Sequence, residues 1–390
     1  RRCCAIAAYG KICRIPGESA LKLFECQNCG QVLFFENTHC EQCGLKVGYY
    51  AHKETMTSVK PDGSNWIALA DPNARYRFCA NWELQACNWL VEAGSEDPYC
   101  LACQHNRTVP DLADPANVPR WQRIEEAKRR LMYTLLKLRL PVPTRASDDP
   151  EPLLFDFLAA APQAKVLTGH DNGIITISLL EADDVEREKL RAHLHEPYRT
   201  LLGHFRHEVG HYYWDRLVRD GGKIDEFRQV FGDETLDYNA ALQAHYQNGA
   251  PANWQENFVS AYATMHPWED FAETWAHYLH IIDTLEMAHT FNLKVSPRLK
   301  STEGLSATAD RDPYTIDDLA ALMAEWIPVT FAVNSLNRSM GQPDLYPFVL
   351  SPAAIEKLGF IHRLVRNSAP AGKRPSETRQ PLLKRLFAKG

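Results

Sequence analysis

The spacing of apolar positions predicts helices over much of the chain. Apolar side chains recur at helical spacing between Trp121 and Leu138, which predicts a long helix. The pattern also predicts a helix over residues 153–160. From residue 181 to about residue 292 the chain is expected to be mostly helical, with a break near Gly249 because glycine weakens a helix.

One segment has the pattern of a β-strand instead. Residues 173–179 are rich in β-branched side chains and follow a turn sequence, Asp171-Asn172-Gly173. Residues 165–168 form a second short apolar run before that turn, so the two runs are expected to pair as a hairpin that turns at residues 170–173. We therefore expect an α+β fold that is mostly helical.

Composition divides the chain into five regions. The regions are an irregular N-terminal extension, a cysteine-rich domain, a linker rich in Pro and Asp, a helical domain, and a basic tail that is expected to be disordered. They cover, in that order, residues 1–20, 21–110, 111–119, 120–365 and 366–390.

Overall composition is that of a globular protein, and it argues against several classes of function. The chain has 390 residues, of which 45% are hydrophobic and 24% charged. The net charge of -6 provides no basic field for nucleic acid. No apolar run is expected to reach the roughly 20 residues that span a bilayer. The first apolar run, about seven residues, is short for an export signal, so we expect a cytoplasmic protein.

The cysteines are distributed unevenly, and this favours metal binding over disulfides. The chain has eleven, an odd number, and eight of them lie between Cys26 and Cys103. None follows Cys103. A disulfide-stapled protein would not leave most of its length without cysteine, whereas paired CxxC motifs in a reducing compartment are typical of metal ligands.

Four cysteines form two CxxC pairs of the kind that hold structural zinc. A glycine follows each pair and permits the tight turn that brings two thiolates to one metal. Two such pairs supply four sulfur ligands, a closed tetrahedral Zn²⁺ site. A redox dithiol or an iron–sulfur cluster is the rival interpretation, but redox pairs normally stand alone beside a βαβ unit. The four ligands are Cys26, Cys29, Cys40 and Cys43.

A second set of four cysteines predicts a second zinc site with less regular spacing. Only its last two members form a CxxC pair, and the ligands of the two sites could also interleave. The set comprises Cys79, Cys87, Cys100 and Cys103.

The segment His207-Glu208-Val209-Gly210-His211 is an HExxH motif. On a helix, His207 and His211 are four residues apart and share one face, so both imidazoles can bind one Zn²⁺. Glu208 lies beside them, where it can accept a proton from a zinc-bound water. A zinc site of this kind needs a third protein ligand and an open fourth position. A third histidine at the spacing HExxHxxGxxH is absent.

The third ligand is expected from a helix that begins at Pro267. Glu269 and Glu273 lie four residues apart on one face of that helix, which suits a ligand carboxylate and a second carboxylate that orients a ligand histidine. Acids in a first helical turn also occur for dipole reasons alone. Other side chains near the motifs remain open as alternative donors: His204, His245, Tyr246, His266, His277 and His280.

These two segments resemble the gluzincin metallopeptidases, which combine HExxH with a downstream glutamate ligand. Residues 269–273 match the glutamate helix of anthrax lethal factor, Glu-Phe-Phe-Ala-Glu, in four of five positions. The resemblance implies that Glu269 is the zinc ligand and Glu273 the carboxylate that supports a ligand histidine. It also implies that Tyr262, seven residues before the ligand, stabilises the oxyanion.

The chain from about residue 21 to residue 365 resembles a bacterial family of zinc-binding metallopeptidases with an N-terminal zinc ribbon. Its segments Phe24-Glu25-Cys26, residues 33–37, Cys87-Asn88-Trp89 and residues 266–270 carry that resemblance. The resemblance implies a zincin-like domain after a small ribbon. The cofactor would be Zn²⁺, one ion catalytic and one or two structural, and the substrate a peptide or protein.

The implied mechanism is hydrolysis of a peptide bond by a zinc-bound water, with Glu208 as general base. Residues 174–179 could form a sheet edge that pairs with an extended substrate. Two alternatives stay open. The ribbon could bind a protein partner while the zincin-like domain is inert, or the enzyme could hydrolyse a non-peptide amide.

Overall fold

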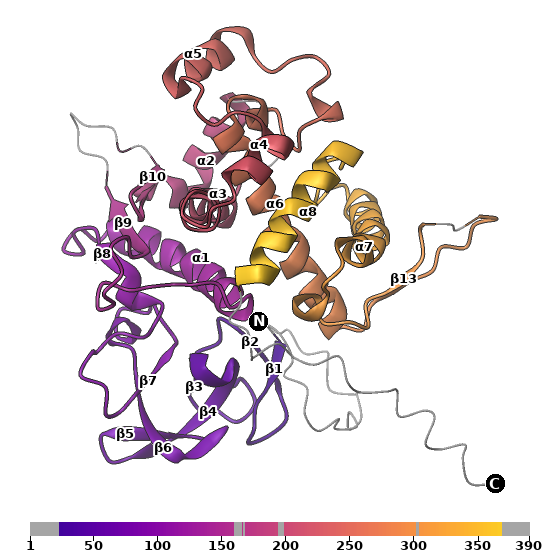
Figure 1. Ribbon diagram of the computed structural model, residues 1–390. Coiled ribbons are helices and arrows are strands. Elements are labelled where there is room, and N and C mark those ends of the chain that lie inside the picture. Colours follow the sequence, from indigo (N-terminus) through magenta and orange to yellow (C-terminus); the bar gives the residue numbers. More distant parts are fainter. Residues whose placement is uncertain (1–22, 160–165, 167, 194–198, 302–303, 369–390) are drawn as a thin grey trace.

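The computed structural model describes most of the chain (Figure 1). The expectations for the N-terminal extension and for the tail beyond residue 368 lie outside the described residues, as do residues 165 and 167 of the run predicted at 165–168. The structure describes residues 23–159, 166, 168–193, 199–301 and 304–368.

The cysteine-rich part is built of short antiparallel strands. Strands β1 and β2 form a two-stranded sheet, and β3 to β7 form a five-stranded sheet in sequence order. Strands β4, β5 and β6 follow one another through tight turns, whereas longer segments that carry cysteines join β2 to β3 and β6 to β7. The strands are β1 (Leu23–Glu25), β2 (Val32–Phe34), β3 (Val47–Tyr50), β4 (Thr55–Asp62), β5 (Asn65–Ala68), β6 (Asp71–Phe78) and β7 (Leu90–Glu92).

A second, four-stranded sheet has the order β10-β11-β9-β8. Strands β8 and β11 run parallel to β9, and β10 runs antiparallel to β11. A hairpin does form here, from β10 and β11, but its first strand is residues 169–171 rather than the predicted 165–168, and its turn is shorter than expected. The strands are β8 (Asn106–Thr108), β9 (Leu154–Leu158), β10 (Gly169–Asp171) and β11 (Ile174–Ser178).

Two sequence-based expectations about this sheet are wrong. Residues 153–160 were expected to be helical, but residues 154–158 form β9, whose first four side chains are all buried. A short, continuous apolar run fits a strand covered on both faces as well as a helix, and periodicity alone does not separate them. Residues 174–179 were expected to form a sheet edge. Strand β11 instead lies between β10 and β9, so β10 is the edge strand of the hairpin.

The described chain has eight helices, of which α1 lies between β8 and β9 in sequence and the other seven follow β11. The helix predicted after residue 120 is confirmed as α1, so a cysteine-rich domain is followed by a domain of helices and sheets. Two further short strands, β12 (Lys294–Val295) and β13 (Ala307–Thr308), pair with each other. The helices are α1 (Asn117–Lys137), α2 (Asp184–His193), α3 (Leu201–Trp214), α4 (Ile224–Phe231), α5 (Tyr238–Asn248), α6 (Pro267–Thr290), α7 (Leu319–Ser339) and α8 (Pro352–Ser368).

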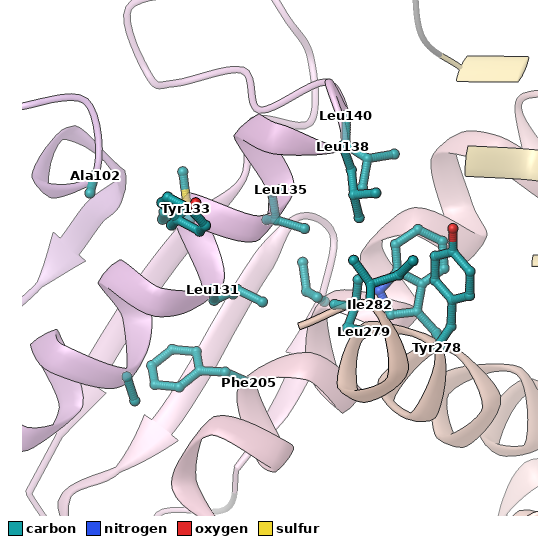
Figure 2. Packing of buried hydrophobic residues seen from close by; sticks show 14 of the residues in the cluster. Ala102, Leu131, Tyr133, Leu135, Leu138, Leu140, Phe205, Tyr278, Leu279 and Ile282 are labelled. Carbon is teal, nitrogen blue, oxygen red and sulfur yellow. The ribbon is translucent and has the colours of Figure 1, made fainter. Parts of the chain in front are cut away.

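Helices α1, α3 and α6 meet in the main hydrophobic core. Figure 2 shows Leu131 and Leu135 of α1, Phe205 of α3 and Leu279 of α6 pointing into the same region. Helices α3 and α6 approach closely at Gly210. A Cβ atom at position 210 would lie 2.9 Å from the Cα atom of Ala272 in α6, nearer than Cβ atoms come to other heavy atoms. The glycine between the two motif histidines therefore lets the two helices touch.

The ribbon and the helical domain share one core. Phe35 and Tyr49 of the ribbon pack against Tyr133 of α1, with ring centroids 5.3 and 5.8 Å apart. Both domains thus bury aromatic side chains at the same contact, and each such pair adds stability beyond the area that it buries. Strand β8 also connects the two domains, because it directly follows the cysteine-rich segment and pairs with β9.

The apolar character of α7 was not expected. The prediction that no apolar stretch is long enough for a membrane span is wrong for this helix by length and composition, since it has 21 residues and a mean hydropathy of 1.4 in its most apolar window. Core helices pass the same test, and one third of that window is buried, including Leu322 and Trp326.

A buried ion pair fixes α8 to α6. Lys357 donates from Nζ to Asp270 Oδ2 at 2.6 Å and to the carbonyl of Asn257 at 2.6 Å. Burial raises the pKa of Asp270 to about 7, although Lys357 acts in the opposite direction. Asp270 adjoins Glu269, so this pair also supports the helix turn that carries the glutamates.

Replacing Lys357 with alanine is expected to lower the free energy of unfolding by about 3 kcal/mol, because it leaves a buried carboxyl group without its partner. Urea denaturation followed by circular dichroism measures the change. The double variant Lys357→Met/Asp270→Asn should recover part of the loss, since neither group is then charged. A single variant as stable as the wild type would contradict the role of this pair.

Candidate metal centre and cysteine clusters

Helix α3 carries the HExxH motif. The side chain of Thr200 caps its N-terminus by accepting a hydrogen bond from the Gly203 amide at 3.0 Å, a common way to satisfy a free helical N–H. His207 and His211 lie one turn apart and face α6. The structure therefore places both histidines as the spacing predicts.

Helix α6 supplies the two glutamates. It begins at Pro267, as predicted, and the ring of His266 caps it by accepting from the Trp268 amide at 3.1 Å. Glu269 and Glu273 are one turn apart on the face that meets α3. Both carboxylates are directed at the histidines of α3.

Three donor atoms converge between the helices. Glu269 Oε2 lies 3.0 Å from His207 Nε2 and 3.4 Å from His211 Nε2, and the two Nε2 atoms are 3.2 Å apart. Glu269 Oε2 is buried and, in the described residues, makes no hydrogen bond of good geometry. Two imidazole nitrogens and one carboxylate oxygen that crowd in this way form a donor set suited to Zn²⁺.

Other side chains hold these donors in place. Glu273 Oε1 accepts from His207 Nδ1 at 2.7 Å, and Ser260 Oγ hydrogen-bonds to the other oxygen of Glu273. The Nε2 atom of His207 is thereby turned toward Glu269. The ring of Trp268 lies against His211 with the centroids 3.7 Å apart. A carboxylate on the far nitrogen of a histidine is the usual support of a metal ligand.

Glu208 is buried beside the three donors. Its side-chain Oε2 has no hydrogen-bond partner among the described residues, an unusual state for a buried polar atom. Burial raises the pKa of Glu208, whereas His207 and His211 act to lower it. An unpaired carboxylate oxygen next to a candidate metal site is a natural acceptor for a proton from water.

The tyrosine proposed from the resemblance lies at the same site. Tyr262 stands in a short 3₁₀ turn, Tyr262–Thr264, and its ring centroid is 6.0 Å from that of His207. Burial and the charge of Glu269 hold the pKa of Tyr262 well above its usual range, so its hydroxyl stays protonated and able to donate.

The alternative donors point elsewhere. Each candidate histidine contacts a partner outside the three-atom cluster, and Tyr246 is 64% exposed. The pairs are His204 with Glu181, His245 with Thr264, His266 with the Leu236 carbonyl, His277 with Tyr346, and His280 with Arg206. The structure therefore brings together the HExxH histidines and Glu269 and leaves the other candidates apart.

The cysteines form two separate clusters and do not interleave. In the first, the Sγ atoms of Cys26 and Cys43 are 3.6 Å apart and those of Cys29 and Cys40 are 3.5 Å apart. All eight described cysteines are free of disulfides. The clusters comprise Cys26, Cys29, Cys40 and Cys43, and Cys79, Cys87, Cys100 and Cys103.

The second cluster is fully buried and adjoins α1. Cys87 and Cys100 have Sγ atoms 3.6 Å apart, and Cys103 Sγ lies 4.0 Å from Glu125 Oε2. Lys128, also fully buried, pairs with Glu125 at 2.8 Å. The positive charge of Lys128 acts on Cys100 and Cys103 as well as on Glu125, and so opposes the negative charge that Glu125 and the thiolates bring.

Three residues of the site were missed by sequence reasoning: Tyr238, Ser260 and Trp268. Tyr238 Oη donates to Glu269 Oε1 at 2.7 Å from the start of α5, 31 residues away in sequence. No motif marks Tyr238 or Ser260. Trp268 directly precedes Glu269, so its closeness to the site could have been inferred from helical position, although its contact with His211 could not.

Comparisons with known proteins agree with this organisation. A family model described as putative zinc-binding metallo-peptidase matches residues 117–364, and a zinc-ribbon domain model matches residues 23–114. Uncharacterized proteins of Mycobacterium bovis and of two strains of Mycobacterium tuberculosis are each 43% identical to the chain over 348 residues, which cover 89% of this chain and 96% of the relative. No solved structure matches the chain. The family and the two cysteine clusters both support zinc as the metal, and the chain belongs to the zinc-binding metallopeptidase family with an N-terminal zinc ribbon.

Proposed function

We propose that the protein is a zinc-dependent peptidase of the gluzincin type, with a zincin-like domain built around α3 and α6. The observation that carries the proposal is the convergence of three donor atoms beside a buried, unpaired carboxylate oxygen. His207, His211 and Glu269 would hold the zinc ion. The protein contributes three ligands, which leaves a position for water or substrate, as in catalytic zinc sites.

The zinc ion, when bound, supplies Lewis acidity that lowers the pKa of a water molecule and polarises the scissile carbonyl. Glu208 accepts the proton from the attacking water and later delivers it to the leaving amine. Tyr262 donates a hydrogen bond to the oxyanion. Glu273 and Ser260 keep the ring of His207 in its orientation throughout.

Strand β10 offers a place for an extended substrate. It is the edge strand of its sheet, and the ring of His170 on β10 lies 6.4 Å from that of His211. An extended peptide can pair with such an edge through main-chain hydrogen bonds. This edge favours a peptide over another amide as the substrate. We assign the pairing with substrate to β10 rather than to β11, the strand that the sequence suggested.

The two cysteine clusters serve, in this proposal, as closed structural zinc sites. Four sulfur ligands leave no position for water, which suits a structural rather than a catalytic role. A protein with eight reduced cysteines fits a reducing compartment, so we propose a cytoplasmic location. Each chain would then bind three zinc ions. The ribbon remains a candidate surface for a protein partner.

Metal analysis together with a peptide-library cleavage screen tests the function. We expect about three zinc ions per chain and cleavage that a chelator suppresses. His211→Ala should bind about two and cleave nothing, because it removes a ligand of the catalytic site alone. His204→Ala, on the same helix but paired with Glu181, should keep three. Three ions in His211→Ala would contradict the site, and a wild type that cleaves no library member would contradict the activity.

A further inference from the structure

Helix α5 is joined to the rest of the protein mainly through the metal site. None of its residues is buried. In Figure 1 it lies at the outer end of the helical domain, away from the core, and a long connection leads from it to α6. Gly232 and Gly249, which flank this segment, have positive φ angles of 99° and 70°, a conformation that glycine adopts readily. A helix without a buried face gains little from packing, so its position depends on a few specific contacts.

Those contacts are made at the two ends of the helix. At the first end, Tyr238 donates to Glu269 and its ring packs on His266 and Trp268 with centroids 5.4 and 6.0 Å away. At the other end, the ring of His245 meets that of Tyr262 at 5.9 Å. Glu269 and Tyr262 belong to the site, Trp268 directly precedes Glu269, and His266 caps the helix that carries Glu269.

The hydrogen bond from Tyr238 also fixes the carboxylate of Glu269. It occupies Oε1, the oxygen that does not face the histidines, and so leaves Oε2 directed at both Nε2 atoms. Without that bond the carboxylate of Glu269 can rotate away from the histidines. A buried site offers few other hydrogen-bond donors that could hold it. A partner on the second oxygen of a ligand carboxylate orients the ligand and raises metal affinity.

We propose that Tyr238 is a positioning residue for Glu269 and the latch of a lid formed by α5. Closing of α5 places the Tyr238 hydroxyl on the ligand carboxylate, so lid closure and metal binding stabilise each other. Opening of α5 would free the face of the site that substrate approaches. The proposal rests on the proposed function, because it assumes that His207, His211 and Glu269 bind the metal.

The variant Tyr238→Phe separates the hydroxyl from the ring. The phenylalanine keeps the packing on His266 and Trp268 and loses only the hydrogen bond. We expect zinc affinity at the HExxH site to fall about tenfold, measured by chelator competition, while the zinc of the cysteine clusters stays bound. We also expect amide hydrogens of residues 238–248 to exchange about tenfold faster.

Tyr246→Phe is the matched control. It makes the same chemical change on the same helix, at a side chain that is 64% exposed, and should alter neither quantity. If Tyr238→Phe exchanges faster but keeps its zinc affinity, the coupling is refuted. If affinity falls while exchange is unchanged, the lid is refuted.

These measurements need no catalytic activity. A wild-type protein that fails to cleave any peptide would contradict the proposed function and leave the latch to be decided by affinity and exchange. In an active protein, Tyr238→Phe should lower kcat more than it raises KM, because the misplaced carboxylate affects the chemical step.

Discussion

Glu208→Gln is expected to lower kcat by about a thousandfold while the protein keeps its full zinc content and its stability. Glutamine has the same shape as glutamate but a neutral amide that accepts no proton at neutral pH. General base catalysis typically contributes a factor of about 10²–10⁴, so a thousandfold loss corresponds to about 4 kcal/mol in the activation free energy.

The structure makes this variant a clean test of chemistry rather than of folding. Oε2 of Glu208 has no hydrogen-bond partner in the described part of the chain, so the substitution breaks no visible contact of that atom. Glu208 is also absent from the three donor atoms that converge on the metal position. Stability and zinc content should therefore match those of the wild type.

Single-turnover and steady-state cleavage of a peptide found in the library screen provide the measurement. Glu226→Gln, an exposed acid at the start of α4, serves as the control and should cleave at the wild-type rate. If Glu208→Gln retains more than about a tenth of wild-type activity after removal of contaminating proteases, Glu208 is not the general base.

The features that could be predicted from the sequence depend on local spacing. Two histidines four residues apart share a helix face in any α-helix, and a CxxC followed by glycine forms a turn wherever it occurs. Helices α3 and α6 and the first cysteine group therefore follow from short segments, whereas the grouping of Cys79 and Cys87 with Cys100 and Cys103 does not. The contact between Glu269 and His207 could be predicted only from the resemblance to known metallopeptidases. Spacing along the sequence does not show which two helices pack together.

The features that escaped prediction depend on distant contacts. Whether residues 154–158 form a strand is decided by β8 and β11, which cover both of its edges. Tyr238 and Ser260 reach the site from loops and helix ends, where no periodic pattern indicates which side chain turns inward. The edge role of β10 likewise follows from sheet order, which the sequence of the hairpin does not contain.

Replacing one cysteine ligand should cost the protein much more stability in the second cysteine cluster than in the first. Cys100→Ser is expected to destabilise the whole protein, whereas Cys29→Ser should disturb the ribbon locally. Cys100 belongs to the cluster whose four members are all buried, and Cys29 to a cluster with two partly exposed members. A structural zinc site contributes free energy on the order of 10 kcal/mol to folding, about the total stability of a domain.

The second cluster is part of the framework of the helical domain. Strand β8 begins directly after the short 3₁₀ turn that holds Cys103, and Arg107 of β8 forms a two-pronged ion pair with Asp156 of β9. The buried pair of Lys128 and Glu125 lies against the same cluster. Loss of the metal would leave Lys128 and Glu125 beside unligated thiols and free β8 from its anchor.

Thermal unfolding followed by circular dichroism, with zinc analysis of the soluble protein, measures the difference. We expect Cys100→Ser to lose at least about 5 kcal/mol of stability, or to be recovered only as insoluble protein. Cys29→Ser should keep the main transition nearer to that of the wild type, because Cys29 is partly exposed and its cluster lies by β1, β2 and β4 rather than by β8. If both variants unfold alike, the second cluster has no special connection to the sheet. If instead they differ as expected, zinc in the second cluster is a condition for assembling the helical domain, since strand β8 of its sheet is anchored at that metal.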